Sequence, residues 1–143
     1  NYNLRIKSWY LRFCFGNIYI VFFPLLVMGK KILVIDDDSD ILNTIRDLLE
    51  SGKMGYEVTA ELDGRKAIEL AKENKYDLIL IDVMMPFPGR EVAKILKDEA
   101  IGNPKLVFCT VVPKPEVELK DMHGFIQKPL DPKKFLSDIK KLL

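Results

Sequence analysis

The sequence predicts an α/β fold in which helices cover both faces of a five-stranded parallel sheet. From Lys30 onward, short apolar runs that suit strands alternate with stretches whose apolar residues recur at helical spacing. This alternation favours right-handed βαβ units and a doubly wound sheet. Four of the strand-like runs also end on an acid, a hydroxyl or an ammonium. A parallel sheet would collect these side chains at one edge.

The predicted strands are short runs rich in branched aliphatic residues. Such runs are typical of strands that are buried on both faces. The segments are Lys30 to Ile35, Tyr56 to Ala60, Leu78 to Ile81, Leu106 to Cys109 and Gly124 to Gln127.

Helical patterns fill most of the intervals between these strands. Ser39 to Glu50 has its apolar residues at the spacing of one buried helix face, and either Asp38 or Ser39 supplies the N-cap. Comparable patterns predict helices that open at Asp63-Gly64, at Gly89 and at Asp131-Pro132.

Composition limits the classes of function. The length of 143 residues suits a single domain. With 22 basic and 21 acidic residues the net charge is +1, which gives no electrostatic case for direct nucleic-acid binding. Cys14 lies in an apolar leader and Cys109 in a buried strand, so we expect no disulfide framework and a reducing, cytoplasmic setting.

The first 28 residues differ from the rest of the chain, because Trp9 to Met28 is almost wholly apolar and aromatic. Its uninterrupted apolar part is about 16 residues, shorter than the roughly 20 that a spanning helix needs. We therefore favour upstream sequence included by a misplaced start over a membrane anchor through residues 9–28. A signal sequence is least favoured, because no small-residue cleavage site follows. The predicted organisation is a leader at residues 1–28 and one domain at residues 29–143.

The consecutive acids Asp36, Asp37 and Asp38 indicate a cation site. Adjacent carboxylates repel one another, and a bound Mg²⁺ would remove that cost. Such a triplet can also be a solvated loop or a helix N-terminus. Asp82, however, directly follows buried aliphatic residues, where an unpaired charge would be expensive. The acids together favour a site for magnesium and a phosphate.

The chain resembles the receiver domain of two-component response regulators. The resemblance covers nearly everything after Gly29 and implies a flavodoxin-like sheet with strand order 2-1-3-4-5. It rests on KILVIDDD at residues 31–38, DLILIDVMMP at 77–86, LVFCT at 106–110 and GFIQKP at 124–129.

The resemblance implies that Asp82 is the nucleophile. It would accept a phosphoryl group from a histidine kinase or a phosphotransfer protein. Mg²⁺ would be the cofactor, held by Asp37, by a carboxylate oxygen of Asp82, by the backbone carbonyl of Met84 and, through water, by Asp36.

The resemblance also assigns roles around the phosphoryl group. Lys128 and Thr110 would bind its oxygens, and Pro129 would follow a cis peptide bond. Thr110 and Phe125 would form the conformational switch. The expected result is a signalling domain that catalyses only its own phosphorylation and dephosphorylation.

The segment between Thr110 and Lys128 is shorter than the family usually has. Its prolines leave room for only a shortened fourth helix around Glu116 to Met122. We expect no catalytic or DNA-binding domain after Leu143. We therefore expect a stand-alone receiver that binds a downstream protein of unknown identity through its own surface, with a phosphorylation-dependent dimer as one possible form.

Two alternatives stay open. A haloacid-dehalogenase-type phosphatase would use Asp36 as nucleophile and Asp38 as acid, and would turn over. A pseudo-receiver would keep the fold and bind partners without being phosphorylated, although the intact site residues argue against it. The lone histidine, His123, is expected to be a surface residue rather than a ligand.

Overall fold

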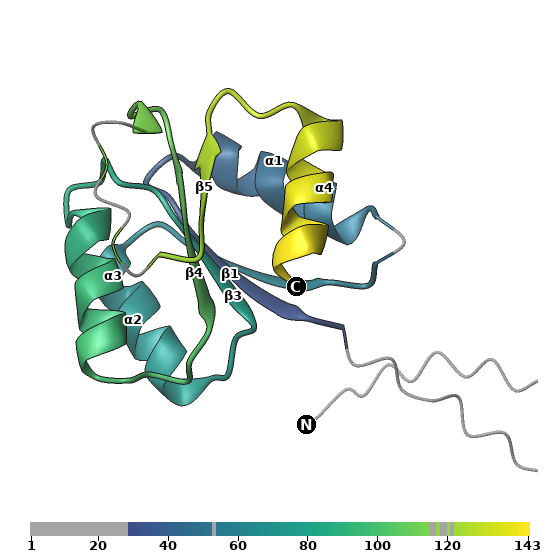
Figure 1. The fold of residues 1–143 in the computed structure, drawn as a ribbon. Coiled ribbons are helices and arrows are strands. Elements are labelled where there is room, and N and C mark those ends of the chain that lie inside the picture. Colours follow the sequence, from purple (N-terminus) through teal and green to yellow (C-terminus); the bar gives the residue numbers. More distant parts are fainter. Residues whose placement is uncertain (1–28, 53, 115–116, 118–119, 121) are drawn as a thin grey trace, which may run out of the picture.

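The computed structural model describes residues 29–143 apart from 53, 115–116, 118–119 and 121. Within these residues, five strands form one parallel sheet in the order β2-β1-β3-β4-β5, which confirms the predicted doubly wound topology (Figure 1). The strands are β1 (Lys31–Ile35), β2 (Glu57–Glu61), β3 (Leu78–Ile81), β4 (Lys105–Thr110) and β5 (Gly124–Gln127). The helices are α1 (Ser39–Glu50), α2 (Gly64–Glu73), α3 (Gly89–Asp98) and α4 (Pro132–Leu142).

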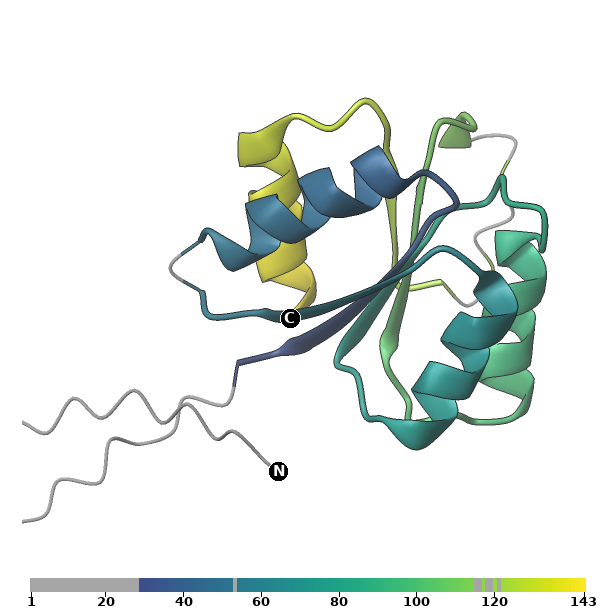
Figure 2. The same ribbon diagram turned by 180° about the vertical axis from the view of Figure 1, so that it is seen from behind.

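The sheet separates two apolar cores. Ile32 and Val34 of β1 pack on the face covered by α1 and α4, while Leu33 and Ile35 pack on the face covered by α2 and α3. Figures 1 and 2 show the two helix pairs on opposite sides of the sheet. Fully burying a side chain of this size contributes about 1.5–3 kcal/mol. The cores therefore hold the strand ends in fixed positions.

Aspartate side chains cap the N-termini of α1, α2 and α4. The Asp38 carboxylate accepts hydrogen bonds from two backbone N–H groups in the first turn of α1, at 2.8 and 3.3 Å. The N-cap of α1 is therefore Asp38, and Ser39 is the first helical residue. Asp63 and Asp131 are the N-caps of α2 and α4, and the carboxylate of each accepts one backbone hydrogen bond.

The predicted fourth helix around Glu116 to Met122 lies largely outside the described residues, as does the leader. Of the described residues there, Val117 is buried in the core under α2 and α3. His123 is exposed, and its Nδ1 accepts a hydrogen bond from the Leu106 backbone N–H at 3.0 Å. Across the described part of the chain, none of the helices is both long enough and apolar enough to cross a membrane.

Gly89 allows the loop after β3 to close tightly at the start of α3. A Cβ atom at this position would lie 1.8 Å from the backbone oxygen of Asp82 and 2.9 Å from a methyl carbon of Ile81. Neither the backbone nor the buried isoleucine can yield by that amount without moving the strand end. The absence of a side chain at Gly89 therefore fixes how closely α3 approaches Asp82.

We predict that Gly89→Ala lowers the free energy of unfolding by about 1–3 kcal/mol, because the added methyl group overpacks the end of β3. Urea denaturation followed by circular dichroism measures this change. Gly52→Ala is the matched control, since the nearest atom to its added carbon would be 3.7 Å away. Equal stability of the two variants would contradict the tight approach.

Candidate functional site

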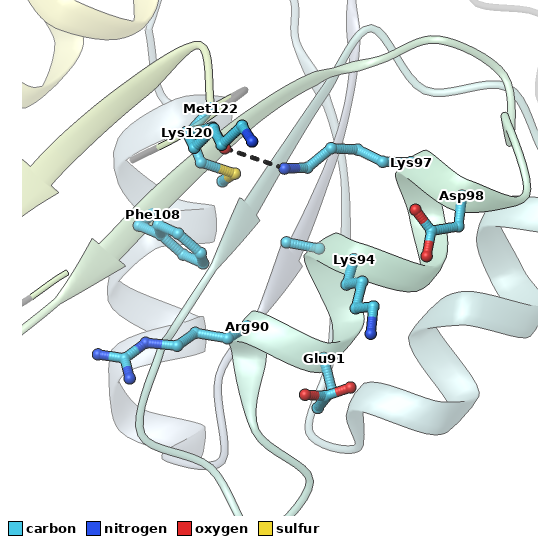
Figure 3. A pocket seen from close by; sticks show the side chains of 9 residues that line it. Arg90, Glu91, Lys94, Lys97, Asp98, Phe108, Lys120 and Met122 are labelled. Atoms are coloured by element: carbon cyan, nitrogen blue, oxygen red, sulfur yellow. Dashed lines mark hydrogen bonds between the residues drawn. The ribbon is translucent and has the colours of Figure 1, made fainter. Parts of the chain in front are cut away.

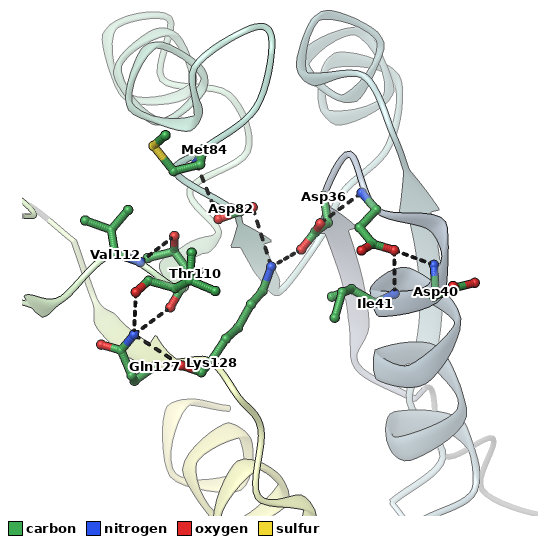
Figure 4. A network of polar contacts seen from close by, with 11 residues as sticks. Asp36, Asp40, Ile41, Asp82, Met84, Thr110, Val112, Gln127 and Lys128 are labelled. Atoms are coloured by element: carbon green, nitrogen blue, oxygen red, sulfur yellow. Dashed lines mark hydrogen bonds and ion pairs between the residues drawn. The ribbon is translucent and has the colours of Figure 1, made fainter.

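The carboxyl ends of four strands bring the predicted site residues to one edge of the sheet (Figure 4). Asp36 follows β1, Asp82 follows β3, Thr110 ends β4 and Lys128 follows β5. The hydrogen-bond ladder continues into the site, because the backbone N–H of Asp82 donates to Ile35 at 2.9 Å and that of Lys128 donates to Thr110 at 2.9 Å. The backbone therefore fixes where each side chain starts.

An acidic cluster lies at this edge. Carboxylate oxygens of Asp36, Asp37 and Asp82 all lie within 4.8 Å of one another. Asp36 and Asp82 are buried, whereas Asp37 is exposed. These oxygens come from the ends of two strands, and the Asp37 carboxylate is open to solvent. Such a set suits Mg²⁺, which prefers hard oxygen ligands and keeps several bound waters. The residues present fit the ion that the sequence predicts.

Lys128 joins the two buried acids. Its ammonium hydrogen-bonds to Asp36 Oδ2 and lies 3.5 Å from Asp82 Oδ2. The side chain emerges from the end of β5 and reaches across the sheet edge to the end of β1 (Figure 4). With Asp36 2% exposed and Lys128 9% exposed, water screens these charges weakly.

Burial and charge shift the protonation of this pair. Burial raises the pKa of Asp36 above its usual value, although hydrogen bonds from Lys128 and from the Asp38 backbone act in the opposite direction. Burial lowers the pKa of Lys128, but its hydrogen bond to Asp36 and the charges of Asp36 and Asp82 outweigh that effect and raise the pKa overall. Both raised pKa values mean that the two groups hold their protons more tightly, which adds positive charge to a site dominated by carboxylates.

The loop after Asp82 is anchored by alternate side chains. Val83 and Met85 are buried in the core under α2 and α3, whereas the Met84 side chain between them is 61% exposed. The backbone N–H of Met84 donates to Asp82 Oδ1 at 3.4 Å. The methionine side chain thus points away from the core, and its backbone lies beside the carboxylate.

Thr110 and Phe125, which the sequence analysis expects to form a switch, lie on the neighbouring strands β4 and β5. Thr110 is fully buried, and its Oγ1 accepts a hydrogen bond from the backbone N–H of Val112 at 3.3 Å. Phe125 is partly buried and packs against the core under α2 and α3. The peptide bond between Lys128 and Pro129 is cis.

Sequence reasoning missed Gln127. Its side-chain Nε2 lies 3.1 Å from the backbone oxygen of Thr110, 2.9 Å from that of Val111 and 3.3 Å from that of Lys128. The amide therefore ties the end of β4 to the end of β5 (Figure 4). A polar residue just before the predicted site lysine was the signal available in the sequence.

Comparison with known proteins identifies the family. Residues 32–140 match the family model described as the response regulator receiver domain. The polar-differentiation response regulator DivK of Brucella anthropi is 33% identical, and the match covers 81% of this chain and 98% of DivK. PhoP of Bacillus subtilis, an alkaline phosphatase synthesis transcriptional regulatory protein, is also 33% identical, but the match covers only 49% of PhoP.

Solved structures agree with this family. The chemotaxis protein CheY4 of Vibrio cholerae has a TM-score of 0.74 at 29% identity, with 80% of this chain and 99% of CheY4 covered. The response regulator TrrA of Thermotoga maritima, solved in complex with Mg²⁺ and BeF, has a TM-score of 0.72 at 26% identity, with the same coverage. These similarities do not favour the phosphatase or the pseudo-receiver.

Receiver domains are phosphoacceptor signalling domains rather than classic enzymes. They bind Mg²⁺ at an acidic pocket and interact with histidine kinases or phosphotransfer proteins and with downstream targets. The sequence motifs, the strand order and the acidic cluster all agree with the family match. The chain belongs to the response regulator receiver domain family.

Proposed function

We propose that Asp82 accepts a phosphoryl group from the phosphohistidine of a histidine kinase or phosphotransfer protein, in a reaction that depends on Mg²⁺. The observation that carries this proposal is the convergence of Asp36, Asp37, Asp82 and Lys128 at one sheet edge. An acid with a nucleophilic role, a cation site and a fixed ammonium are what phosphoryl transfer to a carboxylate requires.

In the transfer step, a carboxylate oxygen of Asp82 attacks the phosphorus atom. The bond between phosphorus and the donor imidazole nitrogen breaks, and its electron pair stays on the imidazole. The Met84 backbone N–H, 3.4 Å from Asp82 Oδ1, and the Lys128 ammonium, 3.5 Å from Oδ2, orient the nucleophile. The same ammonium would also bind an oxygen of the arriving phosphoryl group.

Asp37, a carboxylate oxygen of Asp82 and the backbone carbonyl of Met84 would hold the magnesium ion, and Asp36 would act on it through water. When bound, the ion supplies positive charge that neutralises the oxygens of the transferring group. Asp36 has a second role, because its hydrogen bond holds Lys128 over the site. The protein would thereby catalyse only its own phosphorylation and dephosphorylation.

Phosphorylation adds about −1.5 to −2 charges beside Thr110. The Thr110 oxygen already accepts a hydrogen bond from Val112, so its own hydrogen remains available to donate to a phosphoryl oxygen. Movement of Thr110 toward the site would vacate space that Phe125, on the neighbouring strand, enters by turning inward. The altered surface would then bind a downstream protein or a second copy of the chain.

We predict that acetyl phosphate with Mg²⁺ adds one phosphoryl mass to the full chain and none to Asp82→Asn. Intact-mass spectrometry measures the adduct. Asp38→Asn is the matched control, because asparagine caps a helix about as well as aspartate and this variant should still gain the adduct. An adduct of equal yield in Asp82→Asn would contradict the proposal. Steady release of phosphate that Asp36→Asn abolishes would instead favour a phosphatase.

We predict that Mg²⁺ raises the thermal stability of the unphosphorylated chain, by about 2.7 kcal/mol at a concentration of 100 times its Kd. Asp37→Asn should lose most of this gain, since it removes a charged ligand that solvent can reach. Asp38→Asn should keep it. Thermal unfolding with Mg²⁺ and with a chelator tests the assignment, and an undiminished gain in Asp37→Asn would contradict it.

We predict that Thr110→Val still binds Mg²⁺ and beryllofluoride but no longer transmits the change to Phe125. Valine preserves the volume of this buried side chain and removes the hydroxyl, so the phosphoryl analogue has no donor to draw inward. The NMR signals of the Phe125 ring report the movement, and Thr110→Ser should preserve it. Identical ring shifts in the parent and in Thr110→Val would show that the hydroxyl is not the coupling group.

A further inference from the structure

A groove of about 580 Å³ lies between α3 and the chain that runs through β4 and toward β5 (Figure 3). It is separate from the acidic cluster, and it opens on the side of the sheet that α2 and α3 cover. Phe108 of β4 and Met122, just before β5, contribute its apolar walls together with Ala93 of α3. A volume of this size can receive one or two side chains of a bound segment.

The rim of this groove is rich in positive charge. Arg90, Lys94 and Lys97 recur along α3 at the spacing of one helix face, and Lys120 lies on the opposite wall. The described residues that line the groove include these four cations and two acids, Glu91 and Asp98, so the formal charge of the lining is +2. The whole chain carries a net charge of only +1, so this excess is a local feature.

Part of this charge is available for a partner. Lys94 is exposed and forms no ion pair with any described residue. The Lys97 ammonium donates to the backbone oxygen of Lys120 at 3.1 Å, a neutral acceptor, and no acid within the described residues forms an ion pair with it (Figure 3). These ammonium groups can pair with carboxylates without breaking an existing ion pair of the described structure.

The cationic rim and the apolar walls together indicate which kind of partner would bind in the groove. Nucleic acid is disfavoured, because the balanced net charge of the chain offers no long-range attraction for a polyanion and the apolar walls have no counterpart in a phosphate backbone. An acidic peptide that also carries an apolar side chain satisfies both features. Its carboxylates meet the cations, and its apolar group reaches Phe108 and the adaptable Met122.

We propose that the groove between α3 and β4 docks an acidic segment of a partner protein, with an apolar side chain against Phe108 and Met122 and carboxylates beside Lys94 and Lys97. The test of this surface does not require a phosphoryl donor. It gives the domain a second contact area beside the acidic edge.

The test uses a short fluorescein-labelled peptide in which leucines at helical spacing are flanked by glutamates. Fluorescence anisotropy with the full chain should show saturable binding that weakens as salt is added. Lys94→Glu should weaken binding by about fivefold or more, because it replaces attraction with repulsion at the rim. Lys133→Glu, the same charge change on exposed α4, should alter binding by less than about twofold. A peptide with glutamine in place of glutamate should bind more weakly.

Amide NMR of the labelled chain locates the peptide. Shifts concentrated at Ala93, Phe108 and Met122 would support the proposal. Shifts confined to other surfaces would overturn it, and so would an equal loss of peptide affinity in Lys94→Glu and Lys133→Glu. Equal binding of the glutamine peptide, displacement by a single-stranded oligonucleotide at similar concentration, or no binding up to millimolar peptide would each overturn it as well.

Discussion

The burial of two carboxylates against one lysine is the interaction on which the site depends. Asp36 and Asp82 are almost inaccessible to water, and the Lys128 ammonium lies between them. Removing one partner from a buried pair of this kind typically costs about 3–5 kcal/mol, because the remaining charge has no compensation. Lys128 thus holds the sheet edge together while the acids around it still leave negative charge in excess. The arrangement is stable enough to fold and retains an attraction for cations.

The sheet topology makes this arrangement possible. Because β1 and β3 are neighbours at the centre of the sheet, the residues that follow them emerge side by side, although helices and β2 separate them in the chain. β4 and β5 then add Thr110 and Lys128 along the same edge. Two apolar cores, one on each face, fix the strands, and the close approach at Gly89 fixes the turn after β3. The geometry of the site is therefore a consequence of packing far from it.

Much of the fold and the site follows from local patterns in the sequence. Runs such as Leu78 to Ile81 are strands because four consecutive apolar residues must be buried on two faces, and the acids that follow must then lie at the sheet edge. Local patterns could not decide between Asp38 and Ser39 as the cap of α1, because both residue types suit the position. The structure selects Asp38 through the hydrogen bonds that its carboxylate accepts.

Other features depend on contacts between distant parts of the chain. Lys128 forms a hydrogen bond with Asp36 and lies farther from Asp82. Side-chain packing across the sheet edge sets this difference, so the spacing of residues in the sequence could not predict it. The amide of Gln127 and the imidazole of His123 each find backbone partners on β4 or just beyond it, and such partners become visible once strand register is known. The cationic groove also appears only when α3 is placed against β4.

The identity of the phosphorylated residue tests the account most directly. The full chain would be treated with acetyl phosphate and Mg²⁺ and then with borohydride, which reduces an aspartyl phosphate to homoserine. Tandem mass spectrometry of the resulting peptides locates the reduced residue. We predict homoserine at position 82 and unmodified aspartate at positions 36, 37 and 38. Homoserine at position 36, or no reduced residue in a folded protein, would contradict it.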